Sequence, residues 1–169
     1  MNLGFIGTGK IASSVITGIC KSKIKFKQII ISSRSKKIST SLKKRFKKIV
    51  VLKDNQEIVN KSNWVFLSVT PKVGEKIIKN LKFKTSQTII SFISTINLTE
   101  LKKMIKVKSK IVRAIPLPPI SLKKGPIPIY PPNKNVKNFF DKIGSTIEIK
   151  NEKLSINFWS TSGMMAPFY

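Results

Sequence analysis

The sequence predicts an α/β fold in which a mostly parallel, doubly wound sheet is covered by helices on both faces. Short apolar runs alternate along the chain with segments of helical periodicity, beginning with an apolar run near the N-terminus. The runs are nearly continuous, which is typical of parallel strands that are buried on both faces. The first run leads through two glycines into a helical pattern, as in a right-handed βαβ unit.

The first two thirds of the chain contain six expected strands and five expected helices. The strands are Leu3–Ile6, Gln28–Ser32, Ile49–Leu52, Asn63–Val69, Thr88–Ile93 and Ile111–Ile115. The first four helices are expected over residues 10–21, 35–48, 55–61 and 71–81. Asp54 is expected to cap the third helix in a capping box with Glu57, and Thr99 to cap a short fifth helix.

Proline becomes frequent in the chain after residue 115. The elements expected there are a stiff extended segment at Pro116–Pro119, a short strand at 129–130, a helix at 133–141, a strand at 146–149 and a helix from 151. We therefore expect two units. Residues 1–150 form the α/β domain, and residues 151–169 form the start of a truncated helical domain.

The net charge of +26 at pH 7 is the most unusual property of the composition. Of the 33 basic residues three are arginines, Arg34, Arg45 and Arg113, and the lysines are scattered through expected helices and loops alike. Such scatter differs from a built basic patch, so it does not favour nucleic acid as a partner. The charge still favours anionic ligands through long-range attraction.

Other features of the composition narrow the compartment and the chemistry. Cys20 is the single cysteine, which excludes an intramolecular disulfide and fits a reducing compartment. The absence of histidine excludes histidine-based metal sites and Ser-His or Cys-His catalysis, and we expect no metal site. The chain contains no apolar run of about 18 residues, the minimum for a membrane span. We expect a cytoplasmic protein.

The turn Gly7-Thr8-Gly9-Lys10-Ile11-Ala12 fits the pattern G-x-G-x-x-A between a strand and a helix. The first glycine permits a tight turn, the second lets the backbone approach a pyrophosphate, and Ala12 permits close packing of helix on strand. The helix N-terminus then offers free amides and a positive dipole end to phosphates. The context predicts a Rossmann-type dinucleotide-binding domain. The alternative is an ordinary turn whose glycines serve geometry alone.

The residues after the second strand indicate which dinucleotide is bound. NAD enzymes usually carry Asp or Glu there for the ribose 2′-hydroxyl, whereas this chain has Ser33-Arg34-Ser35. Arg34 can pair with a 2′-phosphate, and the flanking serines can donate hydrogen bonds to it. We therefore predict NADP(H) rather than NAD(H), unless Arg34 is merely part of a basic loop. Further candidate cofactor-binding residues are Asn55, Val69, Thr70 and Pro71, although the last two also suit a helix start.

Four stretches of the chain, in order, resemble the pyrroline-5-carboxylate reductases. They are Leu3–Ala12, Ser32–Ser35, Trp64–Pro71 and Val112–Pro116. The first is shared with other reductases, including the F420-dependent NADP reductases, and the last is more specific. The resemblance implies hydride transfer from NAD(P)H to the C=N carbon of 1-pyrroline-5-carboxylate, a small imine, giving L-proline. It also implies a C-terminal helical domain that forms a homo-oligomer.

The chain departs from the family pattern on the substrate side. Ser94-Thr95 replaces Ala-Gly, Leu117–Pro119 replaces Asn-Thr-Pro, and Gly163–Tyr169 replaces a Ser-Gly-Ser-Gly-Pro-Ala-Tyr segment. No catalytic residue is identified from the sequence. Two alternatives therefore stay open. One is a truncated or degenerate NADP-binding module without turnover, and the other is an F420-dependent NADP reductase-like oxidoreductase with another substrate.

Overall fold

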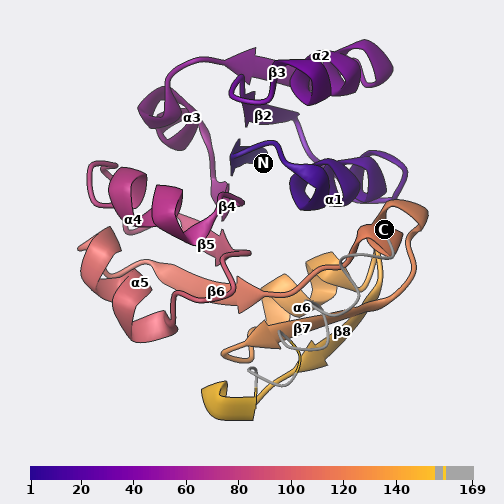
Figure 1. Ribbon diagram of the computed structural model, residues 1–169. Coiled ribbons are helices and arrows are strands. Elements are labelled where there is room, and N and C mark those ends of the chain that lie inside the picture. The colour runs from indigo at the N-terminus through magenta and orange to yellow at the C-terminus, as the bar shows by residue number, and fades with distance from the viewer. Residues whose placement is uncertain (155–157, 159–169) are drawn as a thin grey trace.

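The computed structural model, which describes residues 1–154 and 158, contains one eight-stranded sheet with helices on both sides (Figure 1). The strands are β1 (Asn2–Ile6), β2 (Gln28–Ser32), β3 (Ile49–Leu52), β4 (Trp64–Leu67), β5 (Thr88–Ser91), β6 (Lys110–Ala114), β7 (Pro126–Tyr130) and β8 (Ser145–Glu148). The helices are α1 (Lys10–Cys20), α2 (Lys36–Arg45), α3 (Asn55–Lys61), α4 (Pro71–Ile78), α5 (Leu98–Ile105) and α6 (Lys134–Phe140), with a 3-10 helix η1 (Pro118–Leu122).

The strand order is β3-β2-β1-β4-β5-β6-β7-β8. Every neighbouring pair is parallel except β6 and β7, which run antiparallel. The order 3-2-1-4-5-6 of the first six strands is that of the Rossmann fold. The predicted fold class, a Rossmann-type doubly wound sheet that is mostly parallel, is therefore confirmed.

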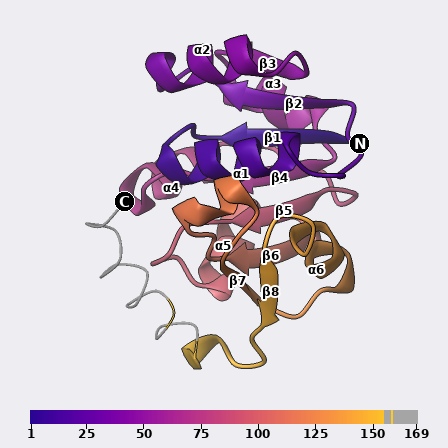
Figure 2. The ribbon, with the colours of Figure 1, turned by 90° about the vertical axis from the view of Figure 1, so that its right-hand side faces the viewer.

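Two hydrophobic cores lie on opposite faces of the sheet. One contains buried residues of α1, α2, η1 and α6, and the other contains buried residues of α3, α4 and α5. Figures 1 and 2 show these two groups of helices on either side of the strands. In β2, Ile29 and Ile31 pack in the first core and Ile30 in the second, because successive side chains of a strand point to opposite faces.

Aromatic side chains fill the middle of the first core. The rings of Phe5 in β1 and Phe66 in β4 stack with their centroids 4.3 Å apart. Phe139 of α6 lies 6.1 Å from the Phe66 ring and 4.9 Å from that of Trp64. Helix α6 is thus packed directly on β4, whose Phe66 stacks on Phe5 of β1.

The structure corrects one predicted helix cap and one predicted capping box. The N-cap of α5 is Asn97, in a capping box with Glu100, and Thr99 lies inside the helix. Asp54 caps α3 as predicted, by accepting from the Gln56 amide at 2.7 Å. The expected capping box with Glu57 is wrong, because the Glu57 carboxylate instead pairs with Lys61 at 2.6 Å, one turn along the helix.

Two expectations for the proline-rich part are also corrected. The predicted extended segment at Pro116–Pro119 gives way at Pro118 to the 3-10 helix η1, since proline suits the first turn of a helix. The strand expected at residues 129–130 begins three residues earlier, at Pro126. The helix predicted from residue 151 is described only at its start, where residues 152–154 are helical. Residues 155–157 and 159–169, including the Gly163–Tyr169 segment, lie outside the described part.

Candidate cofactor-binding site

The candidate site lies where β1 and β4 are neighbours in the sheet. The helix that follows β1 packs on one face and the helix that follows β4 packs on the other, as α1 and α4 show in Figure 1. In open parallel sheets, ligands bind outside the carboxyl ends of the strands at such a reversal of strand order. The predicted G-x-G-x-x-A turn, residues 7–12, is at this position.

Gly7 is required by the fold itself. Its φ of +97° lies in the left-handed region, and a Cβ built there would come within 2.2 Å of the Ser68 carbonyl oxygen. Its amide donates to Ser32 Oγ at 3.0 Å, and the Thr8 hydroxyl donates to the Ser32 carbonyl at 3.0 Å. These bonds tie the turn to the end of β2, where the cofactor-selecting residues were predicted.

Gly9 stands in contrast to Gly7. It is the N-cap of α1 with an ordinary φ of −76°, and a Cβ built on it meets no atom within 4 Å. The protein's own packing therefore does not require glycine at this position, whereas a close-lying ligand would. Ala12, in the first turn of α1, is fully buried, while Lys10 is exposed and Ile11 is half-buried.

A cavity of about 240 Å³ opens beside this turn at the carboxyl ends of β1, β2 and β3. It is lined by Ile6, Gly7, Ser32, Ser33, Arg34, Lys53, Asn55, Val69 and Ile77. The structure thus gathers five of the predicted site residues around one space, from four segments of the chain. The cavity sits against the turn, so a dinucleotide whose pyrophosphate lies on α1 would extend into it.

The other predicted site residues lie outside the lining of this cavity. Ser35 is the N-cap of α2, Thr70 is the N-cap of α4, and Pro71 is the first residue of that helix. Thr70 and Pro71 still follow the carboxyl end of β4, next to β1 in the sheet. Sequence reasoning missed Lys53 and Ile77. The signal for Lys53 was its place one residue after β3, at the same sheet edge as Ser33.

The end of β6 carries a buried ionic contact. Arg113, 4% exposed, pairs with Glu152 at 2.5 Å between Nη1 and Oε1, and its Nη2 donates to the Ser94 carbonyl at 2.6 Å. Burial lowers the pKa of Arg113, while the hydrogen bond and charge of Glu152 raise it. Arg113 belongs to the family-like stretch Val112–Pro116, and in this structure it acts as an anchor for the loop after β5.

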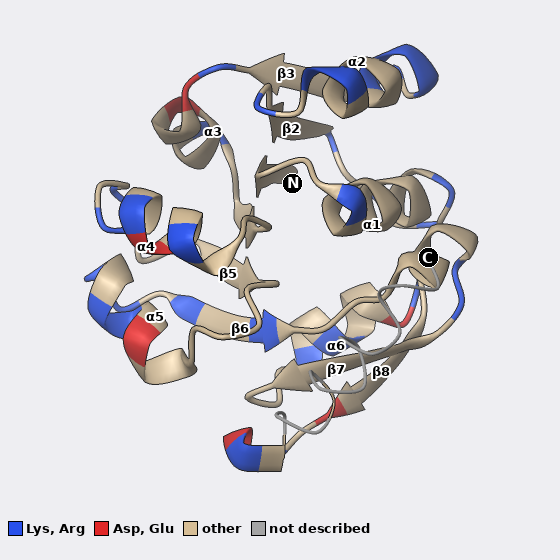
Figure 3. Ribbon diagram, viewed as in Figure 1, with Lys and Arg blue, Asp and Glu red and all other residues tan. Residues whose placement is uncertain are grey.

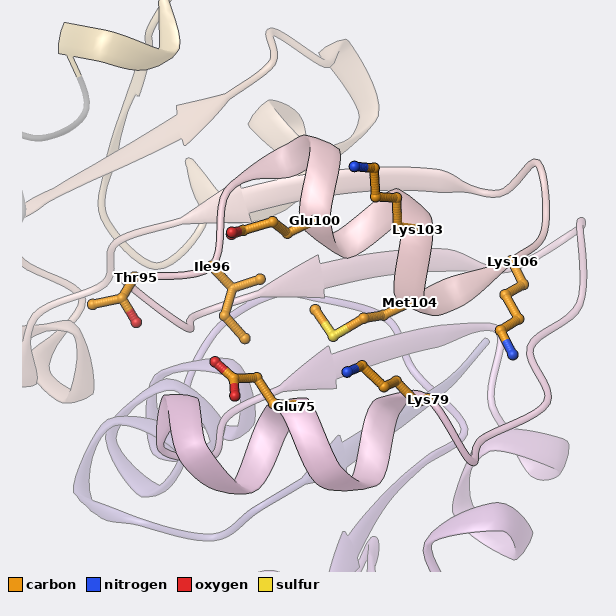
Figure 4. A pocket seen from close by; sticks show the side chains of 8 residues that line it. All are labelled: Glu75, Lys79, Thr95, Ile96, Glu100, Lys103, Met104 and Lys106. Atoms are coloured by element: carbon orange, nitrogen blue, oxygen red, sulfur yellow. The ribbon is translucent and has the colours of Figure 1, made fainter.

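Two further hollows lie away from the predicted residues. A cavity of about 440 Å³ lies between α4 and α5, and its lining includes Glu75 of α4, Lys79 just after that helix and Met104 of α5 (Figure 4). A groove of about 620 Å³ on α2 is lined by Lys36, Lys37, Thr40, Ser41, Lys44 and Arg45. Figure 3 shows that Lys and Arg also occupy other helices and loops, in keeping with the scatter seen in the sequence.

The described residues contain neither a membrane-crossing helix nor a metal-binding cluster. In the range 1–154 and at 158, no helix is long and apolar enough to cross a membrane. Within the same residues, no group of three or more His, Cys, Asp or Glu side chains is placed to hold a metal ion.

Comparison with known proteins places this geometry in a family. The family model described as NADP oxidoreductase, coenzyme F420-dependent, matches residues 2–97. The pyrroline-5-carboxylate reductase of Pisum sativum is 28% identical over 124 residues, which are 71% of this chain and 44% of that protein. The chain thus spans less than half the length of this curated relative.

Solved structures give the same answer over nearly the whole chain. A 1-pyrroline-5-carboxylate reductase from Streptococcus pyogenes superposes with a TM-score of 0.80 and 26% identity, covering 99% of this chain and 65% of that one. A pyrroline carboxylate reductase from Plasmodium falciparum with NADP bound gives a TM-score of 0.82 and 25% identity. That superposition covers 100% of this chain and 64% of the other. The resemblance predicted from the sequence is confirmed. The chain belongs to the NADP oxidoreductase, coenzyme F420-dependent family, and its fold is that of the pyrroline-5-carboxylate reductases.

Proposed function

We propose that this chain binds NADP(H) at the β1–α1 turn and serves hydride transfer to the C=N bond of 1-pyrroline-5-carboxylate or a closely similar small imine. The observation that carries the proposal is the 240 Å³ cavity beside Gly7, in which Ser33, Arg34 and Asn55 meet. The relatives support it, since they are pyrroline-5-carboxylate reductases and one was solved with NADP bound.

The residues present fit such a cofactor. Open space beside Gly9 leaves room for a pyrophosphate to approach the backbone, and the free amides at the start of α1 would hold it. Ser33 and Arg34 would hold the ribose 2′-phosphate by charge-assisted hydrogen bonds. Val69, Thr70 and Pro71, at the carboxyl end of β4, would line the ribose and nicotinamide side.

When bound, NADPH supplies the hydride that reduces an imine carbon. The electron pair of the C=N bond then passes to nitrogen, which takes its proton from solvent, so the product is the cyclic amine. The chain's own contribution is to position the reactants rather than to donate a proton. A protein without histidine can therefore carry out this reaction.

The assay is oxidation of NADPH, followed by its absorbance, with 1-pyrroline-5-carboxylate as substrate and Gly9→Val as the matched negative control. Oxidation by the unsubstituted chain and none by the variant is the expected result. Binding of NADPH without oxidation of it would overturn the catalytic part and favour a module without turnover. Oxidation with another imine or carbonyl compound alone would overturn the choice of substrate.

A further inference from the structure

Lys53 occupies a place in the cavity that the predicted site residues do not explain. It follows β3 directly, and β3 lies beside β2 with Leu52 paired to Ser32. The Ser33 amide donates to the Leu52 carbonyl at 2.9 Å, so the two strands are still joined where they end. Arg34 and Lys53 therefore leave the sheet at the same edge, from neighbouring strands, and both line the cavity.

The charge of the cavity lining is one-sided. Arg34 and Lys53 contribute two cations, and none of the nine lining residues carries a carboxylate. The acid nearest to Lys53 in the sequence, Asp54, caps α3 by accepting from Gln56 and is not among the lining residues. Two like charges at one small space repel each other unless an anion lies between them. The cavity is thus complementary to a group that carries two negative charges.

We infer that Lys53 is a specificity-determining residue that, together with Arg34, holds the 2′-phosphate of NADP(H) from its second side. The inference rests on the proposed function and deepens it. Arg34 offers a planar fork of donors and Lys53 a compact point charge, so the two can bind different oxygens of one phosphate. A 2′-hydroxyl, as in NAD(H), gives Lys53 no anion to pair with, and the contact is therefore selective.

The competing explanation is that Lys53 acts only through the general positive field of a chain with net charge +26. Lys37 separates these explanations. It lies close to Arg34 in the sequence and is exposed, but it lines the groove on α2 rather than the cavity. Lys37→Gln removes the same charge as Lys53→Gln and leaves the cavity lining intact.

The experiment measures dissociation constants of NADPH and NADH for the full chain and for Lys53→Gln, Lys53→Arg and Lys37→Gln at fixed ionic strength. Lys53→Gln is expected to raise the dissociation constant of NADPH by about tenfold or more and that of NADH by less than about twofold. The reason is that a charge-assisted contact is lost for NADPH alone. Lys53→Arg should retain most of the selectivity, because it keeps the charge. Lys37→Gln should weaken NADPH by less than about threefold.

Equal effects of Lys53→Gln and Lys37→Gln on NADPH, or equal losses of NADPH and NADH in Lys53→Gln, would overturn the inference while leaving the proposed cofactor site standing. Failure of the unsubstituted chain to bind NADPH would overturn the proposed function as well. Thermal unfolding of each variant provides the folding control. Because Lys53 is exposed, the fold is expected to tolerate its substitution.

Discussion

Arg113 at the end of β6 and Glu152 after β8 form an ion pair that joins distant parts of the chain at the carboxyl edge of the sheet. The same Oε1 of Glu152 also accepts from the Leu98 amide at the start of α5, at 2.8 Å. One carboxylate oxygen thus fixes the end of a central strand, the first turn of a helix and the segment that leaves the sheet. The loop after β5 is held by the other partner of the ion pair, because Arg113 donates to the Ser94 carbonyl.

Glu152→Ala is expected to lower the free energy of unfolding by roughly 2 kcal/mol, because it removes the carboxylate that pairs with a buried guanidinium. Urea unfolding followed by circular dichroism measures the change. Glu57→Ala is the control, since it breaks the exposed Glu57–Lys61 pair and should cost less than about 0.5 kcal/mol. Similar losses in the two variants would show that Arg113–Glu152 has no special role.

Substitutions of the two glycines in the turn are expected to affect different properties, stability for Gly7 and NADPH binding for Gly9. Gly7→Ala should lower the melting temperature, because it forces a side chain against the Ser68 carbonyl at a positive φ. Gly9→Ala should leave the melting temperature within a few degrees of the original, yet weaken NADPH, since its Cβ would enter the space reserved for the pyrophosphate. Calorimetric scanning and an NADPH titration check both. Unchanged NADPH affinity in Gly9→Ala and Gly9→Val would show that the cofactor does not bind against this turn.

Arg34→Ala should weaken NADPH by roughly 10- to 100-fold and NADH by much less, as a charged hydrogen-bonding partner of the 2′-phosphate is lost. Fluorescence titrations with both nucleotides give the ratio. Arg45→Ala, which removes a guanidinium on the far part of α2, is the matched control and should leave the ratio unchanged. Equal losses for the two nucleotides would refute the assignment of Arg34 to the 2′-phosphate.

Cys20 gives a prediction that is independent of any ligand. Burial raises its pKa from 9.0 to about 11, although the charges of Arg45 and Lys48 oppose the rise. Since the thiolate is the reactive form, the folded chain at pH 8 should react with a disulfide reagent roughly 100-fold more slowly than the chain in urea. The reaction should accelerate as the pH rises toward 11. A folded-state rate equal to that in urea would contradict the burial of this thiol.

The same shift gives a sign for the pH dependence of stability. The folded chain holds the Cys20 proton more tightly than the unfolded chain. The contribution of Cys20 to the free energy of unfolding is therefore fully present below pH 9 and is lost as the pH rises from 9 toward 11. Urea midpoints measured across this range test the direction. Cys20→Ala should show a shallower decline than the unsubstituted chain, and an identical decline would assign the effect to other groups.

Local patterns in the sequence were sufficient for the central sheet. Runs such as Ile29–Ile31 predicted buried parallel strands correctly, because a strand covered on both faces has no polar side. The order of the strands follows from right-handed crossovers and from the fingerprint turn at Gly7 and Gly9. β7 pairs antiparallel with β6, a direction that the periodicity of neither strand encodes.

The misses have physical causes at particular residues. Asn97 and Thr99 are both good cap residues, and the choice of Asn97 was decided by Glu100, whose carboxylate returns to the Asn97 amide. At α3, the Glu57 carboxylate pairs with Lys61 instead of returning to the backbone amide of the N-cap residue. Lys53 was missed because no motif surrounds it, and its place one residue after β3 becomes informative only when the strand order is known. The pairing of β3 with β2 places Lys53 at the same edge of the sheet as Arg34, and both residues line the cavity.

The most direct test of the account is a map of backbone amide shifts in a ¹⁵N NMR titration of the chain with NADPH. The amides of Gly7, Gly9, Ser33, Arg34 and Asn55 are expected to shift together with one saturation curve. The amides around Met104 and Lys106, which line the larger cavity between α4 and α5, should stay unchanged. Shifts confined to that larger cavity, or none at any amide up to millimolar NADPH, would contradict the placement of the cofactor.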